Sequence, residues 1–492
     1  MSRILLFAPW ARYSPHFETD LEIIENHLEQ GDEVHFVGCD AELVACDRNP
    51  HHDLVRCNVC IGRREAGLAL LSAPVRRVPL WVLAPEDHAE LAALDVDFDD
   101  AEDLKRFAVE QFDIGYAVLS TMVSFLRDPD PMASANRPVM RGLLVSALAV
   151  YRSFQHQVER TRYDRVYVFN GRFAITRAVL RACASRGVEC YTHERGHHHD
   201  HYALYRNTTI HDIEHFERAI REAWDAADPI ERERLGTRFY EERAQGAEQG
   251  WFSFIEAQQR GLLPHGFDEN RRNVVFFNSS QDEFEAIGET WRNPLYDDQE
   301  HAVARVARAL RGRDDVHVYL RVHPNLAGLD NAQTRAIAAL DEPNLTVIPA
   351  ESPVCTYALL RAARTVVSFG STVGIEAVYW GVPSILAGQC YYRGLGGVLL
   401  PASHDEVVAL LERDLDPGPR EPALMYGHFL STFGTPYRHY AAEGVFEGRF
   451  HGRRVRPGAA RAGLAALLRL ARPLERVLRR RALARVRSGL IG

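Results

Sequence analysis

Three polar segments in the second half of the chain combine residue types that bind phosphates and sugar hydroxyls. They span residues 278–280, 321–325 and 370–376. Each lies at the end of a short apolar run (NVVFF, VHVYL and TVVSF) that is typical of a strand buried on both faces of a parallel sheet. Because open parallel sheets bind ligands beyond the carboxyl ends of their strands, the three segments together predict one nucleotide site.

The first two segments carry amide, hydroxyl, guanidinium and imidazole groups. The first segment consists of Asn278, Ser279 and Ser280. One of these serines can cap a helix that follows the strand and leave backbone amides free to bind an anion. The alternative is that the serine acts only as a helix cap. In the second segment, Arg321 and His323 share one strand face. Pro324 ends that strand, so His323 and Asn325 stand at its mouth and suit a phosphate or a base-sugar group. A salt bridge for Arg321 and a core position for His323 are the structural alternative.

The third segment suits a phosphate followed by a ribose. Gly370 permits a tight turn, and Ser371 and Thr372 stand where a helix N-terminus presents unpaired amides. Glu376 lies one turn further and can accept hydrogen bonds from ribose hydroxyls. Tyr392 and Arg393, in a glycine-rich loop after the last strand, are expected to contact the donor from one side. Neither a P-loop nor a GxGxxG fingerprint is present, which argues against kinases and dehydrogenases.

Polar residues also end two apolar runs in the first half of the chain. Asn170 and Arg172 follow VYVF, and Glu194 follows VECYT. A carboxylate at this place can take the proton of an acceptor hydroxyl. An ion pair of Glu194 with Arg172 or Arg195 is the structural alternative. Around Glu194 lie several histidines that match no common metal spacing and favour a polar loop or phosphate contacts over a metal: His193, His197, His198, His199 and His201.

Four of the eight cysteines lie close together in the sequence. Cys39, Cys46, Cys57 and Cys60 have the spacing C-x6-C-x10-C-x2-C. Four thiolates can close a tetrahedral structural zinc site in a loop insertion over 39–60. Four ordinary buried thiols or a facultative disulfide are the alternatives. We expect no cofactor for the chemistry itself.

These residues need a scaffold of alternating strands and helices, and the hydrophobic pattern predicts two such α/β units. In the first, strands are expected at 4–9, 34–37, 114–119, 165–169 and 188–192, and helices at 19–30, 101–112, 139–160, 173–186 and within 213–260. In the second, strands are expected at 273–277, 316–322, 345–348, 365–369 and 383–386, and helices behind NVVFF and at 297–311, 331–340, 354–363 and 372–380. The pattern predicts two Rossmann-like doubly wound domains, 1–265 and 270–415, with 416–492 as a crossover and a helical tail.

Composition excludes several classes of protein. The 492 residues are 46% hydrophobic and 25% charged, which argues against disorder and against a disulfide miniprotein. The net charge of −9 disfavours nucleic acid as a partner. No apolar stretch reaches the roughly 18–20 residues of a membrane helix, and no signal-peptide core is present, so a cytoplasmic location is expected.

The C-terminal tail is locally basic. Nine arginines lie between residues 461 and 487, interleaved with leucines at helical spacing. This pattern predicts either peripheral contact with the anionic inner face of the plasma membrane or a final helix packed on the domains with a solvated basic face.

The order NSSQDE, RVHPN and FGSTVGIEAVYWGVPSI resembles the C-terminal domain of bacterial capsule polysaccharide biosynthesis proteins. Those are glycosyltransferases of the two-Rossmann GT-B fold, with a cleft between the domains. The His-Pro and Ser-Thr pairs are similar to the CMP-binding motifs of bacterial sialyl-, polysialyl- and Kdo transferases. The resemblance implies that His323, Pro324, Ser371 and Thr372 contact a CMP group and that Glu376 binds ribose. Glu194 is loosely similar to the acidic-x-Gly catalytic base of polysialyltransferases.

The resemblance implies transfer of a sugar from a nucleotide-activated donor, with a CMP-sugar favoured, to a surface or capsular polysaccharide or a glycolipid. Glu194 would activate the acceptor hydroxyl, and Arg321 and the amides of residues 371–372 would stabilise the leaving nucleotide phosphate. His323 is the second catalytic residue, and we expect transfer to be lost without it. Two alternatives remain: a nucleotide-sugar epimerase of the same fold, and a non-catalytic capsule-assembly factor.

Overall fold

The computed structural model describes residues 1–94, 97–250 and 252–491, and the chain divides into two compact α/β units. The first unit comprises Met1–Leu126, Asp130–Ile210 and Gly434–Gly492, and the second comprises Arg127–Pro129 and His211–Phe433. The sequence placed the boundary at 265–270, and the structure places it at 210–211. The reason is packing: α9 (Pro229–Ala244) lies against α15 (Glu421–Leu430), where the Tyr240 hydroxyl donates to Ala423 O at 2.6 Å.

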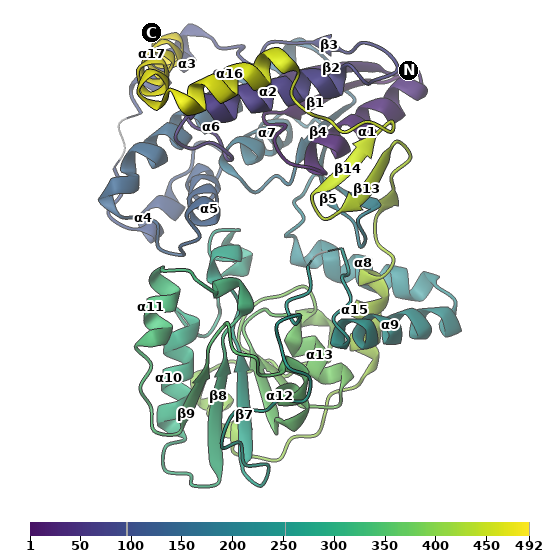
Figure 1. The fold of residues 1–492 in the computed structure, drawn as a ribbon, viewed down its shortest axis with the longest axis vertical. Coiled ribbons are helices and arrows are strands. Elements are labelled where there is room, and N and C mark those ends of the chain that lie inside the picture. The colour runs from purple at the N-terminus through teal and green to yellow at the C-terminus, as the bar shows by residue number, and fades with distance from the viewer. Residues whose placement is uncertain (95–96, 251, 492) are drawn as a thin grey trace. The chain divides into compact units, whose positions relative to one another are not determined.

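The first unit is built on a sheet with the order β12-β6-β5-β4-β1-β2-β3 (Figure 1). Its parallel strands are β1 (Arg3–Ala8), β2 (Glu33–Gly38), β3 (Arg76–Arg77), β4 (Arg165–Phe169) and β5 (Cys190–Arg195). Two antiparallel strands extend it, β6 (His201–Arg206) and β12 (Thr435–Pro436). The order β3-β2-β1-β4-β5 is doubly wound and Rossmann-like, as the alternation of apolar runs predicted.

Helices and a hairpin complete the first unit. The helices are α1 (His16–Glu29), α2 (Leu54–Leu68), α3 (Pro85–Ala92), α4 (Ala101–Arg106), α5 (Ile114–Leu126), α6 (Arg137–Arg160), α7 (Ala174–Ser185), α16 (Ala459–Leu470) and α17 (Arg472–Ile491). The hairpin is formed by β13 (Tyr440–Gly444) and β14 (Glu447–Phe450). The last two helices are the helical tail that the sequence predicted, and they meet at Ala471, just before Pro473.

The expected strand at 114–119 is wrong, because this segment is the start of α5. The helix is buried on most sides, so its residues form a continuous apolar run like that of a buried strand. A Cβ at Gly115 would lie 1.7 Å from Leu104 O, so the helix also relies on glycine for its approach to α4. The helix expected over 101–112 is correspondingly short and ends at Arg106.

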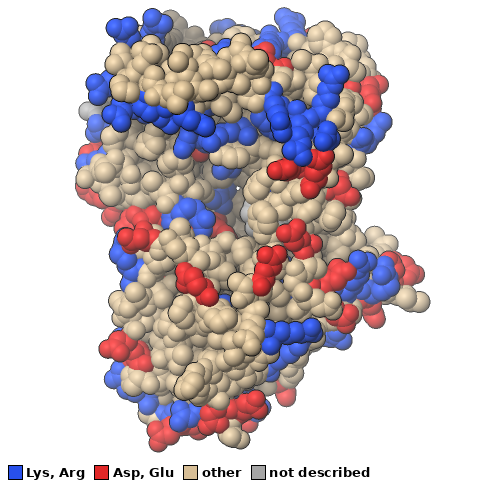
Figure 2. Space-filling model, viewed as in Figure 1, with Lys and Arg blue, Asp and Glu red and all other residues tan. Residues whose placement is uncertain are grey.

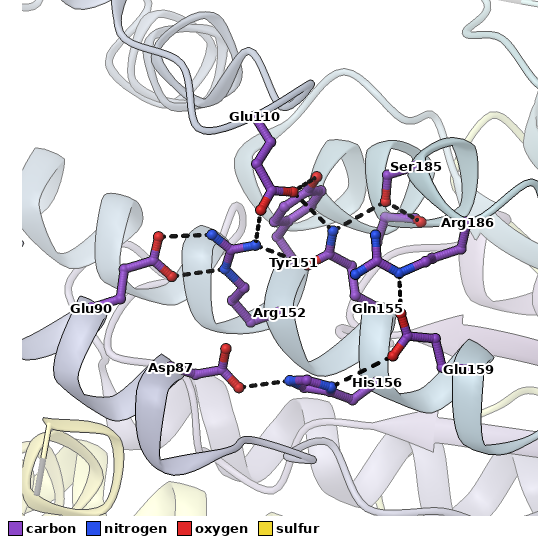
Figure 3. A network of polar contacts seen from close by, with 11 residues as sticks. Asp87, Glu90, Glu110, Tyr151, Arg152, Gln155, His156, Glu159, Ser185 and Arg186 are labelled. Atoms are coloured by element: carbon purple, nitrogen blue, oxygen red, sulfur yellow. Dashed lines mark hydrogen bonds and ion pairs between the residues drawn. The ribbon is translucent and has the colours of Figure 1, made fainter.

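A polar network holds α3, α6 and α7 together (Figure 3). Arg152 of α6 donates to both oxygens of Glu90 at 2.7 and 2.8 Å and also to Glu110. Gln155, one turn further, donates to Glu110 and to Ser185 of α7, each at 3.1 Å. The network gives the guanidinium of Arg152 carboxylate acceptors and links α6 to both α3 and α7.

The second unit is built on a parallel sheet with the order β11-β10-β7-β8-β9. Its strands are β7 (Arg272–Phe277), β8 (Val316–Arg321), β9 (Leu345–Ile348), β10 (Thr365–Ser368) and β11 (Ser384–Leu386). Its other helices are α8 (Ile213–Ala226), α10 (Gln299–Ala309), α11 (Ala332–Ala338), α12 (Thr356–Ala362), α13 (Val373–Tyr379) and α14 (His404–Leu411). Alternate residues of β7 pack into the cores on opposite faces of the sheet, Val274 and Phe276 on one and Val275 and Phe277 on the other. All five strands run in the same direction, but β8 and β9 follow on one side of β7 while β10 and β11 follow on the other. The border between β7 and β10 is therefore the switch point where ligands of such sheets bind.

The helix expected behind NVVFF does not form. Only a short 3₁₀ turn, Gln281–Glu283, follows the strand. The amides of this loop find tertiary partners instead: Ser279 N donates to Gln299 Oε1 at 2.8 Å, and Gln281 N donates to Gln333 Oε1 at 3.0 Å. With its backbone satisfied from α10 and α11, the loop has no need of helical hydrogen bonds.

Candidate functional site

The three polar segments of the second unit meet around one cavity of about 550 Å³. It lies beyond the ends of β7, β8 and β10, at the switch point of the sheet. Its volume falls in the range of about 300–1,000 Å³ that is usual for sites of small organic ligands. The residues predicted from the sequence that line it are Asn278, Ser279, Arg321, His323, Pro324, Asn325, Gly370, Ser371, Thr372 and Glu376.

Arg321 places a buried positive charge on the wall of this cavity. The residue is 2% exposed, and its guanidinium donates to Pro349 O and, at 3.2 Å, to Ser352 O. Within the described chain no carboxylate lies within ion-pairing distance of it, and its Nε has no hydrogen-bond partner. Burial lowers the pKa of Arg321 because water is removed from the charge. A bound anion would compensate for the hydration that the guanidinium loses when it is buried.

Two further donors face the same cavity without partners. Asn278 Oδ1 accepts a hydrogen bond from His323 N at 2.8 Å. The amide nitrogen Nδ2 of Asn278 is buried and has no hydrogen-bond partner among the described residues. The hydroxyl of Ser279 is also buried without a partner among the described residues. Gln333 Nε2 donates to Ser279 O at 3.0 Å, so the loop is held in place from behind. Buried donors with no partner at a cavity wall are the groups that a ligand would satisfy.

His323 is arranged as a hydrogen-bond donor. Its Nδ1 accepts from Asn325 N at 3.1 Å, so the proton of the neutral ring belongs on Nε2. Burial lowers the pKa of His323 to about 4, so the ring is neutral near pH 7. Its Nε2–H can therefore donate to a ligand. Its Nδ1 can take up a proton only by losing the hydrogen bond from Asn325 N.

Glu376 is already engaged by three side chains. Its Oε1 accepts from Arg243 Nε at 3.0 Å and from Thr372 Oγ1 at 2.9 Å, and its Oε2 accepts from Tyr357 OH at 2.6 Å. A carboxylate has about four acceptor positions, so one position on Oε2 is left for a ribose hydroxyl. Arg243 also donates to Thr372 Oγ1 at 3.1 Å, and the buried carboxylate beside it raises the pKa of Arg243.

Several residues at the cavity carry no signal in the sequence. Arg127 comes from the chain that connects two helices of the first unit; it ion-pairs with Asp282 and donates to Asn325 O at 3.2 Å. Arg243 ends α9, and the ring of Phe254 lies edge-on to His323 at 5.5 Å. No motif surrounds these residues, and all lie in segments that the sequence assigned to the first domain. Only the fold brings them to the cavity.

Three residues predicted for the donor site lie outside the cavity lining. Ser280 is fully buried, and its hydroxyl donates to Asp282. Arg393 donates to Gly388 O at 3.1 Å in its own loop. Tyr392, also expected to touch the donor, is 1% exposed and donates to Ser371 O at 2.6 Å, so it supports the turn instead.

In the first unit the structure brings Asn170 and Glu194 together at the ends of β4 and β5. Asn170 Nδ2 donates to Glu194 Oε2 at 2.9 Å, from a left-handed backbone with φ of 58°. His16 Nδ1 lies 3.6 Å from Glu194 Oε1, and burial lowers the pKa of His16 well below its ordinary value. Arg172, two residues beyond Asn170, is 9% exposed. A carboxylate next to a neutral imidazole and an amide donor is oriented and remains able to accept a proton.

The cysteines and histidines do not form a metal centre in the described ranges. Among these residues no group of three or more His, Cys, Asp or Glu side chains is arranged to hold an ion. The four clustered cysteines are free thiols, and burial raises the pKa of Cys39 to about 11. Cys57 and Cys60 lie on α2 rather than in a loop insertion, and each accepts a hydrogen bond, from Asn49 Nδ2 and Ala11 N. His193 is buried against Asp20 at 2.7 Å.

No family model and no curated protein matches this sequence. Solved structures similar to it include Thermosulfurimonas dismutans KpsC, a beta Kdo 2,4 transferase, with 13% identity over 54% of this chain and 79% of that one and a TM-score of 0.36. They also include the calicheamicin glycosyltransferase CalG4, with 13% identity over 95% and 98% and a TM-score of 0.27. A third is the UDP-GlcNAc 2-epimerase of Neisseria meningitidis bound to UDP-GlcNAc, with 9% identity over 87% and 97% and a TM-score of 0.25. At these values the likenesses assign no residue here.

Proposed function

We propose that this protein is a glycosyltransferase that moves a sugar from a nucleotide-activated donor to a growing surface or capsular polysaccharide or a glycolipid in the cytoplasm. A CMP-sugar is the favoured donor, on the resemblance of the RVHPN and GST segments to CMP-binding motifs. The observation that carries the proposal is the buried guanidinium of Arg321, which has no carboxylate partner in the described chain and stands beside the unsatisfied donors of Asn278 and Ser279.

The cavity would hold the nucleotide of the donor with its phosphate next to Arg321. Asn278 Nδ2, Ser279 Oγ and His323 Nε2–H would donate to phosphate oxygens, and the remaining acceptor position of Glu376 would take a ribose hydroxyl. As the bond between sugar and phosphate breaks, negative charge grows on the leaving phosphate. Donors that are already fixed by the fold stabilise that charge without reorganising, so they act mainly on the transition state.

Glu194 is the residue we assign to the acceptor hydroxyl. Its carboxylate is oriented by Asn170 and faces a neutral His16. It would take the hydroxyl proton as the acceptor oxygen attacks the sugar. Glu194→Gln keeps the shape and the hydrogen bond from Asn170 but removes the base. We expect this variant to bind the donor nucleotide normally and to lose transfer.

Nucleotide binding by the purified protein tests the donor site. Titration calorimetry with CMP, CDP, UDP, GDP and ADP should give one preferred ligand, and Arg321→Gln should weaken it by about 10- to 100-fold, because a hydrogen bond to a charged group contributes about 1.5–3 kcal/mol. Arg335→Gln is the matched control, since Arg335 is exposed in the same unit and pairs with Asp330. His323→Ala provides a second variant in case the buried Arg321 is needed for folding.

Each outcome has a separate meaning. Selective binding of CMP supports the CMP-sugar donor, and selective binding of UDP or GDP keeps the transferase but replaces the donor. No binding of any nucleotide contradicts the proposal. Conversion of a nucleotide-sugar without an acceptor would identify an epimerase. Full biological activity of the Arg321 and His323 variants would favour an assembly factor.

A further inference from the structure

The two C-terminal helices have one face fixed against the first unit. On α16, Ala465 and Leu468 are buried and pack with Val55 of α2. At the start of α17, Glu475 is 2% exposed and accepts from Leu54 N at 3.2 Å. At its end, His88 of α3 donates to Leu490 O at 2.8 Å. Because both ends of α17 and the middle of α16 are held, the other sides of these helices are presented to solvent in a definite orientation.

The solvent-facing side carries a row of aliphatic side chains. Of the fourteen large apolar side chains that are exposed among the described residues, six lie within residues 464–478. Leu464, Leu467 and Leu470 recur every third residue along α16 and are 40%, 56% and 86% exposed. Leu474, Val477 and Leu478 continue the row on the first turns of α17, at 48%, 47% and 36% exposed. Such a concentration marks an interaction surface, since single exposed apolar residues are usually scattered.

Arginines surround this row, and most of them have no acidic partner. Arg472 pairs with Asp53, Arg479 lies near Glu475, and Arg461 donates to Asn58. The remaining arginines of the two helices are exposed and form no ion pair with any described residue: Arg469, Arg476, Arg480, Arg481, Arg485 and Arg487. Glu475 is the one acidic residue of 459–491, although the whole protein carries a net charge of −9. In Figure 2 the tan surface over α16 is bordered by basic side chains.

We propose that α16 and α17 form a docking surface for an anionic phospholipid bilayer. The arginines would contact lipid phosphates, and the row 464–478 would enter the boundary between headgroups and acyl chains. Nucleic acid would satisfy the arginines but not the six aliphatic side chains interleaved with them. The helices lie on the bilayer rather than cross it, because no helix of the described residues is long and apolar enough to span one. The proposal rests on the surface of the first unit and is independent of the nucleotide cavity.

Cosedimentation of the full chain with vesicles tests this surface. The vesicles are either pure phosphatidylcholine or phosphatidylcholine mixed with phosphatidylglycerol. Because each basic residue near an anionic surface contributes about a five- to tenfold preference, the wild type should favour the mixed vesicles by at least about tenfold. The triple variant Arg476→Gln/Arg480→Gln/Arg481→Gln should lose most of this preference, and salt should weaken binding of the wild type.

The apolar part of the surface has its own variant and control. Leu467→Ser/Leu470→Ser should weaken binding to mixed vesicles and leave circular dichroism unchanged, because both side chains are exposed. Ile230→Ser is the matched apolar control, since Ile230 is 81% exposed on α9. Arg234→Gln/Arg238→Gln/Arg292→Gln is the control for the loss of three exposed arginines.

Two results would overturn the proposal. One is vesicle binding without the expected dependence: the wild type partitions equally into neutral and anionic vesicles, or neither the arginine variant nor the leucine variant binds less than the wild type. The other is tight binding of duplex DNA that depends on the arginines but not on the leucines, without vesicle binding. Both results can occur whether or not the cavity binds a nucleotide.

Discussion

Glu300 lies behind the cavity of the second unit with its charge buried, and this makes the free energy of unfolding depend on pH. The side chain is in the first turn of α10 and is 4% exposed. Its Oε1 accepts from Gln333 Nε2 at 2.9 Å, and the same amide group holds the loop at Ser279 and Gln281. No cation pairs with Glu300 among the described residues. Burial therefore raises its pKa from 4.5 to about 7.

The size and sign of the effect follow from this shift. A rise of about 2.5 units corresponds to about 3 kcal/mol between the protonated and ionised forms. Because the folded state holds the proton more tightly than the unfolded chain, stability is full below pH 4.5 and falls as pH rises toward about 7. Glu300→Gln removes the charge but keeps an acceptor for Gln333. The free energy of unfolding of the variant should match that of the wild type near about pH 4 and exceed it by up to about 3 kcal/mol near about pH 8.

Urea unfolding of both proteins at the two pH values measures this difference through the midpoint at constant slope. Glu233→Gln is the matched control, because it removes one charge from an exposed position of the same unit. The control should show the wild-type dependence on pH. If Glu300→Gln is less stable than the wild type near pH 8, or keeps the same loss of stability between the two pH values, then Glu300 is ionised at little cost and the reasoning is wrong.

Three further results are expected. Arg152 holds the pKa of Glu110 at about 2, so the stability from this pair should be lost as pH falls from 4.5 toward 2, and acid unfolding of Glu110→Gln should lack that component. Tyr357→Phe leaves one oxygen of the buried Glu376 without its donor and should cost about 1–3 kcal/mol in thermal unfolding, with weaker nucleotide binding; unchanged values would contradict the role of Tyr357. The ratio of CMP affinities between the wild type and His323→Asn should stay constant between about pH 5 and 8, because the pKa of His323 is about 4; a change near pH 6.5 would show that the ring is protonated there.

Much of the second unit was predictable because its central strands, β7, β8 and β10, are largely buried on both faces. Such strands require continuous apolar runs, and the runs predicted at 316–322 and 365–369 match β8 and β10 within one residue. The run at 345–348 matches the edge strand β9. The polar residues that end these runs must lie at one edge of the sheet, so ten of the residues that line the cavity could be named from the sequence. The same property made the prediction at 114–119 wrong, since a helix buried on most sides has little periodicity to distinguish it from a strand.

The sequence by itself determined the two α/β units and the polar segments at the strand ends, because local hydrophobic patterns decide which strands are buried and where they stop. The tertiary structure alone decided the partners of those segments. Arg127 and Arg243 reach the cavity from distant parts of the chain, and Glu376 accepts hydrogen bonds from Arg243 and Tyr357, which no local pattern indicates. It also decided that 211–265 belongs to the second unit. These outcomes depend on packing between residues far apart in the chain, on which local patterns carry no information.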